Sequence, residues 1–416
     1  MRKYFCAIAA AFMSLTAVAQ TYYVDSTNPE ILKHSETLGT NRTEIFLPQV
    51  NGYNVYKADL HTHTLYSDGS VMPAFRVLEA WQQGLDIIAI TDHLESRRTE
   101  EVMVKYLKKY LEEHPVDLIV STGPPQSMHL IGRRLARETG IPWIADFRDP
   151  WTKIFYFKHL SMTRATQRWH KRMEKKVLDD ATAVVAVSPL VQQEFQAMTQ
   201  TSVELITNGY DECDFPHGKC EEATGGPDKD FTITHTGLFA ADGNPTTLWS
   251  VLAEKCAKDE DFRKLLKIKL VGKTDEQIIG SIKEAGLEEN LIDMGYQPHA
   301  AAVEEQRRAS LLILPLRKEP EYKAVLPGKL FEYLASWRPV LGIGQPDGAM
   351  SMILNTTKTG IVLNWEDKTS ISRFIDYCWK KHQSGELTVE DADISRFTRR
   401  NLTHQMATLF NDTTKL

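Results

Sequence analysis

The chain has 416 residues, 42% of them hydrophobic and 25% charged, which is typical of a globular protein with two or three domains. Its formal net charge of −6 argues against nucleic acid as a partner, because binding to nucleic acid needs a basic face that releases counterions. After the first twenty residues no apolar run approaches the about 20 residues that cross a bilayer, so we expect no transmembrane segment.

The first 19 residues predict a signal peptide. Arg2 and Lys3 form a basic start, residues 5–18 an apolar core, and Ala17-Val18-Ala19 a cleavage site before Gln20. The alternative is a buried first helix or strand. A cleaved signal peptide would place the mature chain in the periplasm or outside the cell.

Residues 20–52 are polar and predict an N-terminal arm, after which strands and helices alternate. We expect strands at 55–60 and 85–91, with helices at 73–83 and 99–113, the first of them ended by Gly84. Further on, the predicted strands are 117–121, 143–147, 183–187 and 203–206, with helices at 127–139, 162–178 and 190–196. Such alternation is typical of parallel sheets with right-handed crossovers.

A segment rich in glycine, proline and charge, 216–230, predicts a linker between two domains. A second α/β domain is expected over 231–388, with strands at 231–235, 267–271, 291–293, 311–314, 340–343 and 360–363. Residues 389–416 predict a C-terminal helix. The fold class is therefore α/β, with two Rossmann-like doubly wound domains.

A metal-ligand pattern stands at the front of the chain. Asp59, His61 and His63 alternate along a predicted strand and so share one face, and two imidazoles two residues apart can chelate a divalent metal. Asp68 in the following loop can close on that metal, and His93 ends the next parallel strand.

These motifs resemble the PHP family of metal-dependent phosphoesterases over about 50–112, which gives a PHP-like fragment at 53–112. The resemblance implies that His61, His63 and His93 are ligands of Zn, Mn or Fe, and that Asp68 is a ligand or a second-sphere partner. The further ligands that the family needs, a glutamate, more histidines and an Asp-x-His, are not found downstream. The alternative is a remnant without a working metal site.

From about residue 113 the motifs change. They are VDLIVSTGPPQS at 116–127, IPWIADFRDPW at 141–151, ITNGYD at 206–211, THTG at 234–237, and PGKLFEYLA at 327–335 followed by Arg338-Pro339-Val340. Together they resemble family 4 glycosyltransferases of the GT-B type. The resemblance implies a partial acceptor-side domain at 113–215 and a donor domain for a nucleotide-sugar at 231–388, the first completed or replaced at its N-terminal side by the PHP-like βαβ fragment.

A diphosphate leaving group needs positive charge and N–H donors. Gly237 would let the backbone approach the phosphates, the turn after it would open a helix, and the helix beginning near Gly328 offers an anion-binding N-terminus. The candidate phosphate ligands are Lys273, Arg317 and Lys329, with a solvated surface charge as the alternative for each.

Two carboxylates are the catalytic candidates. By the resemblance, Glu332 would accept hydrogen bonds from the ribose hydroxyls. Asp149 would orient the acceptor or the sugar, although Arg148-Asp149 could equally form a structural ion pair. The family's chemistry requires no metal or other cofactor.

Two positions depart from the family's pattern. Ala324 stands where the first of two glutamates spaced by eight is expected, and Gly243 where an arginine is common. Both changes remove contacts to the donor.

The resulting expectation is a retaining glycosyltransferase of polysaccharide biosynthesis. It would use a nucleotide-diphosphate sugar and a glycan or lipid-linked acceptor, and would be impaired by a truncated acceptor domain. The alternatives are a PHP-type phosphoesterase and an inactive chimeric product. The two predictions disagree on where the protein is located. A signal peptide implies export, whereas nucleotide sugars are made in the cytoplasm.

Overall fold

The computed structural model describes residues 42–43, 55–64, 71–90, 97–160, 162–215, 228–389 and 392–415. The predicted signal peptide, most of the N-terminal arm and linker, and the candidate ligands Asp68 and His93 lie outside these ranges. The chain divides into two compact units, Met1–Asp92 and His93–Leu416. Among the described helices none combines the length and the apolar character needed to cross a membrane.

The first unit contains a βαβ element, as predicted. Strands β1 (Ala58–Thr62) and β2 (Ile87–Ile90) pair in parallel, with Ala58 opposite Ile87, and helix α3 (Pro73–Gln82) connects them. Pro73 starts the helix, where its missing N–H costs nothing. Gly84 follows it with a φ of 80°, a conformation that favours glycine.

The described strands form three separate sheets, of which β1–β2 is one. The sequence left open whether this element completes or replaces the missing part of the next sheet. Among the described strands, β1 and β2 form a two-stranded sheet of their own, so the structure does not show a continuous extended sheet.

The second unit begins with helix α4 (Arg97–Glu113), which the sequence analysis assigned to the PHP-like fragment up to residue 112. Val104 on α4 is buried in one cluster with Ile131 and Leu135 of helix α5 (Ser127–Thr139). This apolar contact explains why the structure divides the chain near residue 92 rather than at 112.

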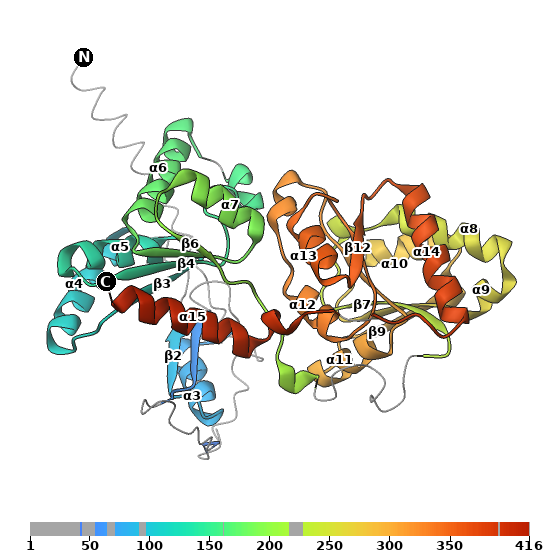
Figure 1. The fold of residues 1–416 in the computed structure, drawn as a ribbon, viewed down its shortest axis with the longest axis horizontal. Coiled ribbons are helices and arrows are strands. Elements are labelled where there is room, and N and C mark those ends of the chain that lie inside the picture. Colours follow the sequence, from blue (N-terminus) through green and yellow to red (C-terminus); the bar gives the residue numbers. More distant parts are fainter. Residues whose placement is uncertain are drawn as a thin grey trace, which may run out of the picture. The chain divides into compact units, whose positions relative to one another are not determined.

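A four-stranded parallel sheet follows, with its strands in the order of the sequence. The strands are β3 (Ile119–Gly123), β4 (Trp143–Phe147), β5 (Ala183–Ala186) and β6 (Val203–Leu205). The connections contain α5, α6 (Arg164–Asp180) and α7 (Pro189–Met198). A sheet that grows in one direction through right-handed crossovers places all its connecting helices on one face, as Figure 1 shows.

The other face is covered by the C-terminal helix α15 (Arg399–Thr414). Trp143, Ala145 and Phe147 point to the face with α5, α6 and α7, whereas the alternate residue Ile144 packs toward α15. The residues of α15 in this second cluster are Leu402, Met406, Leu409 and Phe410. Figure 1 shows α15 running along the sheet opposite the connecting helices.

The remaining sheet has six parallel strands in the order β12-β11-β10-β7-β8-β9, the doubly wound arrangement that was predicted. They are β7 (Phe231–Thr236), β8 (Leu266–Val271), β9 (Leu291–Gly295), β10 (Leu311–Pro315), β11 (Val340–Ile343) and β12 (Gly360–Leu363). The strand order reverses between β7 and β10, and in doubly wound sheets the crevice that takes the ligand lies beyond the carboxyl ends of the strands at this reversal.

The connecting helices of this domain lie on both faces of its sheet (Figure 1). They are α8 (Thr246–Lys258), α9 (Glu260–Leu265), α10 (Glu276–Glu284), α11 (His299–Arg308), α12 (Gly328–Ala335), α13 (Ala349–Thr357) and α14 (Lys368–Gln383).

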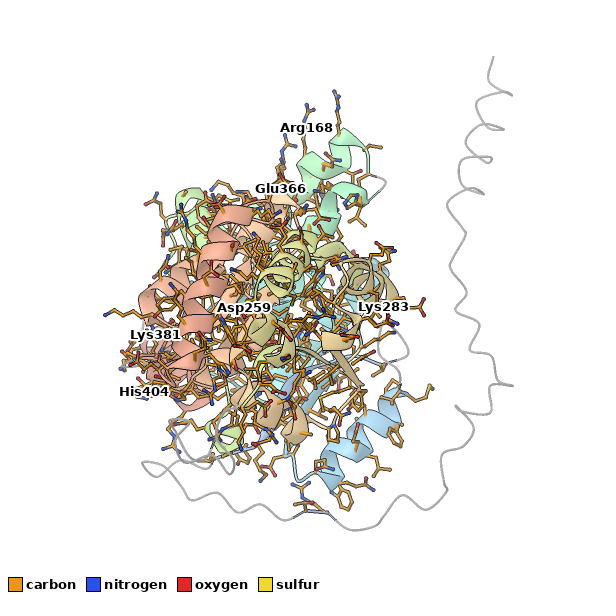
Figure 2. All side chains as sticks on the ribbon, turned by 90° about the vertical axis from the view of Figure 1, so that its right-hand side faces the viewer. Arg168, Asp259, Lys283, Glu366, Lys381 and His404 are labelled. Carbon is orange, nitrogen blue, oxygen red and sulfur yellow. The ribbon has the colours of Figure 1, made fainter. Side chains whose placement is uncertain are left out.

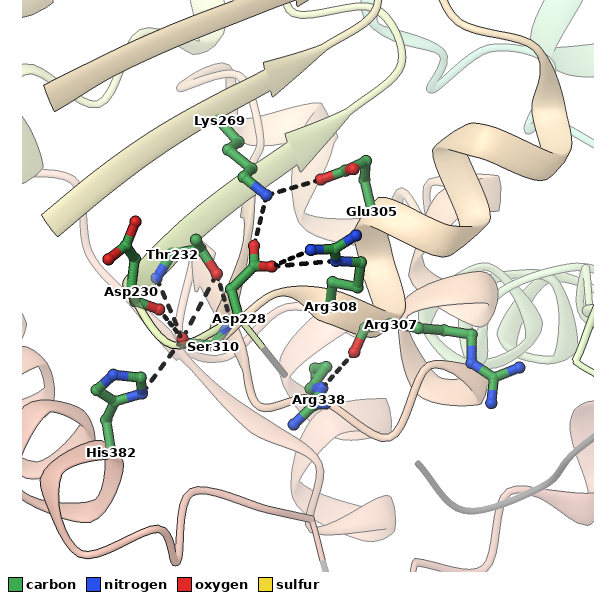
Figure 3. A network of polar contacts seen from close by, with 10 residues as sticks. All are labelled: Asp228, Asp230, Thr232, Lys269, Glu305, Arg307, Arg308, Ser310, Arg338 and His382. Atoms are coloured by element: carbon green, nitrogen blue, oxygen red, sulfur yellow. Dashed lines mark hydrogen bonds and ion pairs between the residues drawn. The ribbon is translucent and has the colours of Figure 1, made fainter. Parts of the chain in front are cut away.

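A polar network ties the start of this domain to its sheet (Figure 3). Asp228, just before β7, accepts hydrogen bonds from Lys269 on β8 and, at 2.8 and 3.0 Å, from the guanidinium of Arg308 on α11. Lys269 also donates to Glu305 at 2.9 Å. The network does not lie at the carboxyl ends of the strands. It therefore stabilises the sheet and does not contribute to the crevice.

We predict that Leu409→Asp lowers the melting temperature of the protein by several degrees, because it puts a charge against the apolar face of the four-stranded sheet. The matched control is Ala407→Asp, at an exposed position of the same helix. Differential scanning calorimetry measures both. Equal effects of the two substitutions would show that α15 does not stabilise this sheet.

Candidate active site

Three glycines stand at the carboxyl ends of three neighbouring strands. Gly237, Gly272 and Gly295 follow or end β7, β8 and β9, with φ values of 86°, 129° and 59°. Their backbones are tied together, since Gly237 N–H donates to Val271 at 2.7 Å and Gly272 N–H to Gly295 at 2.7 Å. A Cβ on Gly272 would lie 2.5 Å from the Gly237 carbonyl oxygen. Only glycine fits there, and the result is a backbone floor that a ligand can approach closely.

Lys329, a predicted phosphate ligand, reaches over this floor. Gly328 and Lys329 begin α12, and the Lys329 ammonium donates to the carbonyls of Thr236, at 2.7 Å, and Leu238, at 3.2 Å. A Cβ on Gly237 would come within 2.9 Å of Lys329 Nζ. Burial lowers the pKa of Lys329 to about 8, against the opposing effect of the nearby Glu332 carboxylate. A desolvated cation therefore lies directly above the glycine turn.

Glu332 is held one turn further along α12 by a side chain that the sequence analysis missed. Gln306, buried on α11, donates to Glu332 Oε2 at 2.9 Å and to Thr236 Oγ1 at 3.1 Å. Tyr333 OH in turn accepts the Thr236 N–H at 2.9 Å. The chain of contacts fixes the Glu332 carboxylate toward the carboxyl end of β7, on the same crevice as Lys329.

His299 was also missed. It begins α11, and its Nε2 lies 3.0 Å from Asp214 Oδ2 in the turn after β6. The hydrogen bond to Asp214 raises the pKa of His299, and the Glu332 charge contributes to the same shift. No spacing in the sequence joins residues 214 and 299, because the contact exists only once the two domains are folded.

Arg317 and Lys273 occupy different settings. Arg317 follows β10 at the switch point, but its Nε lies 2.9 Å from Asp242 Oδ2, and its guanidinium lies 5.0 Å from the ring centroid of Phe155 and 5.4 Å from that of Tyr322. Asp242 thus already compensates its charge, and Arg317 would have to leave this carboxylate to bind a phosphate. Lys273 is exposed directly after Gly272, and no side chain in the described ranges forms an ion pair with it.

Asp149 lies just beyond the end of β4. Burial raises its pKa to about 6, although the Arg148 charge opposes the shift. Burial raises the pKa of Tyr156 and of Tyr322, and the Asp149 charge adds to both shifts, so these two rings lie near it. Asp149 is therefore a half-buried carboxyl group close to aromatic side chains from both domains, a setting that suits proton transfer near neutral pH.

The alternative ion pair between Arg148 and Asp149 is not what the structure shows. Arg148 pairs instead with Asp146 at 3.3 Å and donates to Asn208 Oδ1 at 2.5 Å. The alternation of β4 explains this, because residues 146 and 148 share a face and residue 149 does not.

The two departures from the family's pattern fall on short 3₁₀ turns. Ala324 ends the turn Pro320–Ala324 and packs against the core of the four-stranded sheet, and Gly243 ends the turn Ala241–Gly243. The turn after Gly237 was expected to open a helix, but α8 begins only at Thr246. Near Ala324, the buried Glu319 Oε2 has no hydrogen-bond partner among the described residues.

Two of the four predicted metal ligands, His61 and His63, lie within the described residues. His61 Nε2 and His63 Nε2 lie 3.1 Å apart, so the two imidazoles do face each other as the strand alternation predicts. The described ranges contain no group of three or more potential metal ligands. Two imidazoles are too few to hold a hydrolytic metal, and the site as a whole stays a prediction.

Two comparisons with known proteins, one with family models and one with solved structures, support the α/β assignment. A family model described as a glycosyl transferase 4-like domain matches residues 60–209, a range that includes most of the segment predicted to be PHP-like. An uncharacterized protein of Methanocaldococcus jannaschii is 34% identical over 90 residues, which is 20% of this chain and 41% of that protein. The chain thus matches less than half of that relative's length.

Solved glycosyltransferase structures share the fold. A glycosyltransferase from Rickettsia africae has a TM-score of 0.60 at 13% identity, with 87% of this chain and all of the other covered. Sucrose-phosphate synthase from Thermosynechococcus elongatus has a TM-score of 0.59 at 14% identity, with coverages of 86% and 98%. A UDP-forming trehalose-phosphate synthase from Burkholderia xenovorans has a TM-score of 0.50 at 9% identity, with coverages of 76% and 77%. The fold is therefore that of GT-B glycosyltransferases.

The lowered pKa of Lys329 makes a testable contribution to stability. The unfolded chain keeps the Lys329 proton up to its ordinary pKa of 10.5, whereas the folded chain loses it near pH 8, so wild-type stability rises with pH between these values. We predict that wild type gains about 2 kcal/mol relative to Lys329→Met between pH 7 and pH 10, measured by urea denaturation. Lys273→Met, which removes an exposed ammonium, is the control. A difference between wild type and Lys329→Met that does not change with pH would contradict the desolvated position of Lys329.

Proposed function

We propose that the protein is a hexosyltransferase that transfers a sugar from a nucleoside-diphosphate donor to a glycan or lipid-linked acceptor. The observation that carries the proposal is the crevice where the strand order of the six-stranded sheet reverses. There Gly237, Lys329 and Glu332 converge from separate parts of the sequence. The match to the glycosyl transferase 4-like family model and the GT-B fold support the same class of reaction.

The geometry suits a donor whose diphosphate lies over Gly237. The glycine turn lets the phosphates approach the backbone closely, and Lys329, with its neighbouring N–H groups at the start of α12, supplies positive charge. Lys329 would exchange its two carbonyl partners for phosphate oxygens, and the anion would favour its charged form. Glu332, fixed by Gln306, is placed to accept hydrogen bonds from ribose hydroxyls.

Asp149 is the candidate for contact with the sugar or the acceptor. With a pKa of about 6, its carboxyl group exchanges its proton close to neutral pH and can either donate to or accept from a hydroxyl group. We propose retention of configuration, with no protein nucleophile and with the departing phosphate taking the acceptor proton. No residue in this account requires a metal.

We further propose that turnover is low. The four-stranded sheet supplies a partial acceptor-side domain, and Ala324 and Gly243 offer neither a carboxylate nor a guanidinium to the donor. The ion pair of Arg317 with Asp242 also lowers turnover, because Asp242 would compete with a donor phosphate for the guanidinium.

The nucleotide site is tested by isothermal titration calorimetry of the purified chain with UDP and GDP. We predict micromolar binding of at least one nucleotide, weakened about tenfold or more in Glu332→Ala, because a ribose hydrogen bond to a charged group is worth roughly 1.5–3 kcal/mol. Glu284→Ala, an exposed carboxylate on α10, is the matched control and should bind like wild type. Absence of heat with both nucleotides, in a chain shown to be folded, would overturn the proposal.

One observation favours a second candidate, a metal-dependent phosphoesterase activity of the PHP-like fragment. The imidazoles of His61 and His63 face each other at 3.1 Å, which is compatible with a shared divalent ion once Asp68 and His93 are added. Stoichiometric Zn, Mn or Fe in the purified protein, together with phosphatase activity lost in His61→Ala, would favour it. An inactive fusion product would show neither bound metal nor bound nucleotide. Export by the predicted signal peptide is a separate hypothesis, which mass spectrometry of the mature N-terminus tests.

A further inference from the structure

A cavity of about 200 Å³ lies in the second unit, and none of the candidate site residues lines it. Most of its walls are apolar and come from segments far apart in the sequence: Pro189, Leu205, Met352, Ile353, Phe397 and Leu402. The first two belong to the domain of the four-stranded sheet, at the start of α7 and the end of β6, and the next two to α13 of the other domain. The cavity therefore lies where the two domains of this unit meet.

The cavity adjoins the place where the chain crosses between these domains, which we call the hinge. Tyr210 N–H donates to the Phe397 carbonyl at 3.0 Å, and Arg399 N–H donates to the Tyr210 carbonyl at 2.9 Å. Gly209 leaves no room for a Cβ against the same Phe397 carbonyl, so the two segments lie backbone against backbone. Thr207, two residues before Gly209, and Phe397 both line the cavity. An occupant would therefore touch both crossing segments of the hinge.

Phe397 links the cavity to the candidate active site. Its ring centroid lies 5.4 Å from that of Phe331, which is buried on α12. Phe331 stands between Lys329 and Glu332, the two residues of α12 assigned to the donor. An occupant packed against Phe397 would thus hold, through one ring contact, the helix that carries both residues.

One cation stands beside the apolar walls. Arg396 is exposed, its guanidinium lies 4.8 Å from the ring centroid of Phe397, and no side chain within the described ranges forms an ion pair with it. The other polar residues at the cavity are uncharged: Thr207, Thr356 and Gln405. Among the described residues that line the cavity none is acidic. An apolar space with one positive charge beside it is complementary to an amphipathic anion.

The volume limits the size of that anion. A cavity of about 150 Å³ holds one benzene molecule, whereas sites for drug-sized ligands have about 300 Å³ or more. The cavity of about 200 Å³ therefore fits one aromatic ring with a short substituent and excludes nucleotides and long acyl chains. A nucleotide would also need more positive charge than the single guanidinium of Arg396 supplies.

We propose that this cavity binds a small aromatic carboxylate and that its occupation strengthens nucleotide binding. The ring of the ligand packs against Met352 and Leu402, and its carboxylate pairs with Arg396. The occupied cavity restrains Phe397 and, through Phe331, helix α12. A nucleotide then meets a helix that is already ordered, so binding costs less conformational entropy.

Binding is measured by ligand-observed NMR titration of the purified full chain with 3-phenylpropionate, which combines one ring, a two-carbon chain and a carboxylate. We expect a dissociation constant of roughly 0.1–1 mM, because the ligand is small. Arg396→Gln should weaken binding about fivefold through the loss of an exposed ion pair. The uncharged 3-phenylpropanamide should bind wild type about as weakly. Thr356→Trp, which puts a large side chain at the cavity wall, should weaken binding about tenfold or more.

The matched controls are Arg168→Gln on α6 and Thr369→Trp on α14. Both positions are exposed and neither lines the cavity, and Figure 2 shows Arg168 extending away from the ribbon. Both controls should bind 3-phenylpropionate like wild type, with unchanged circular dichroism in all four variants. No binding to wild type, or equal loss in the variants and their controls, would overturn the proposal. Arg396→Gln and the amide decide the question if Thr356→Trp does not fold.

The effect on the nucleotide rests on the proposed function and is measured separately, by calorimetric titration with UDP and GDP in the absence and presence of saturating 3-phenylpropionate. We expect about fivefold tighter binding of the nucleotide, at the low end of typical couplings, and the same factor for the carboxylate when the nucleotide is saturating. Nucleotide binding that the carboxylate leaves unchanged would overturn the coupling. A chain that binds 3-phenylpropionate in the cavity but neither nucleotide would contradict the proposed function and the coupling, and would support the cavity as a binding site.

Discussion

The one-sided winding of the four-stranded sheet is the constraint on which the second unit depends. Its strands follow one another in sequence order, so right-handed crossovers place α5, α6 and α7 on a single face. A complete doubly wound domain would cover the second face with helices from its other half. Here α15 returns from the end of the chain to do so, through Leu402, Met406, Leu409 and Phe410. The C-terminal residues thereby stabilise a domain that is far away in the sequence.

The candidate active site follows from the other sheet, which winds in both directions. The strand order reverses between the neighbouring strands β7 and β10, and doubly wound sheets bind their ligands beyond the carboxyl ends at such a reversal. Glycines with positive φ remove the side chains that would fill this space, and α12 points its first turn toward it. The Lys329 ammonium, whose pKa burial lowers to about 8, lies within hydrogen-bond distance of the carbonyl oxygens of Thr236 and Leu238 and of His235 Nε2.

Much of this arrangement could be predicted from the sequence. Apolar runs such as 311–314 and 340–343 coincide with β10, to within one residue, and with β11, because strands buried on both faces leave an unbroken hydrophobic signal. Of the residues predicted for the donor site, the structure brings Gly237, Lys329 and Glu332 close together, and their role in binding a donor stays a prediction. The strand predicted at 55–60 is β1 at 58–62, a shift expected where the hydrophobic pattern is short.

Other features depend on contacts that no local pattern records. Gln306 positions Glu332, and Asp242 neutralises Arg317, only after distant segments have folded together. The partner of Arg148 proved to be Asp146 rather than Asp149. The role of α15 could not be predicted, since its apolar residues do not indicate which sheet they cover. Asp68, His93 and the signal peptide stay predictions.

The most direct test of the account is hydrogen–deuterium exchange of the whole chain with and without saturating UDP. If the crevice of the six-stranded sheet binds the nucleotide, protection should appear at the carboxyl end of β7, around Gly237, and in the first turns of α12. Residues of β3 to β6 should change little. Protection confined to the four-stranded sheet, or absent throughout the chain, would contradict the assignment of this crevice as the donor site.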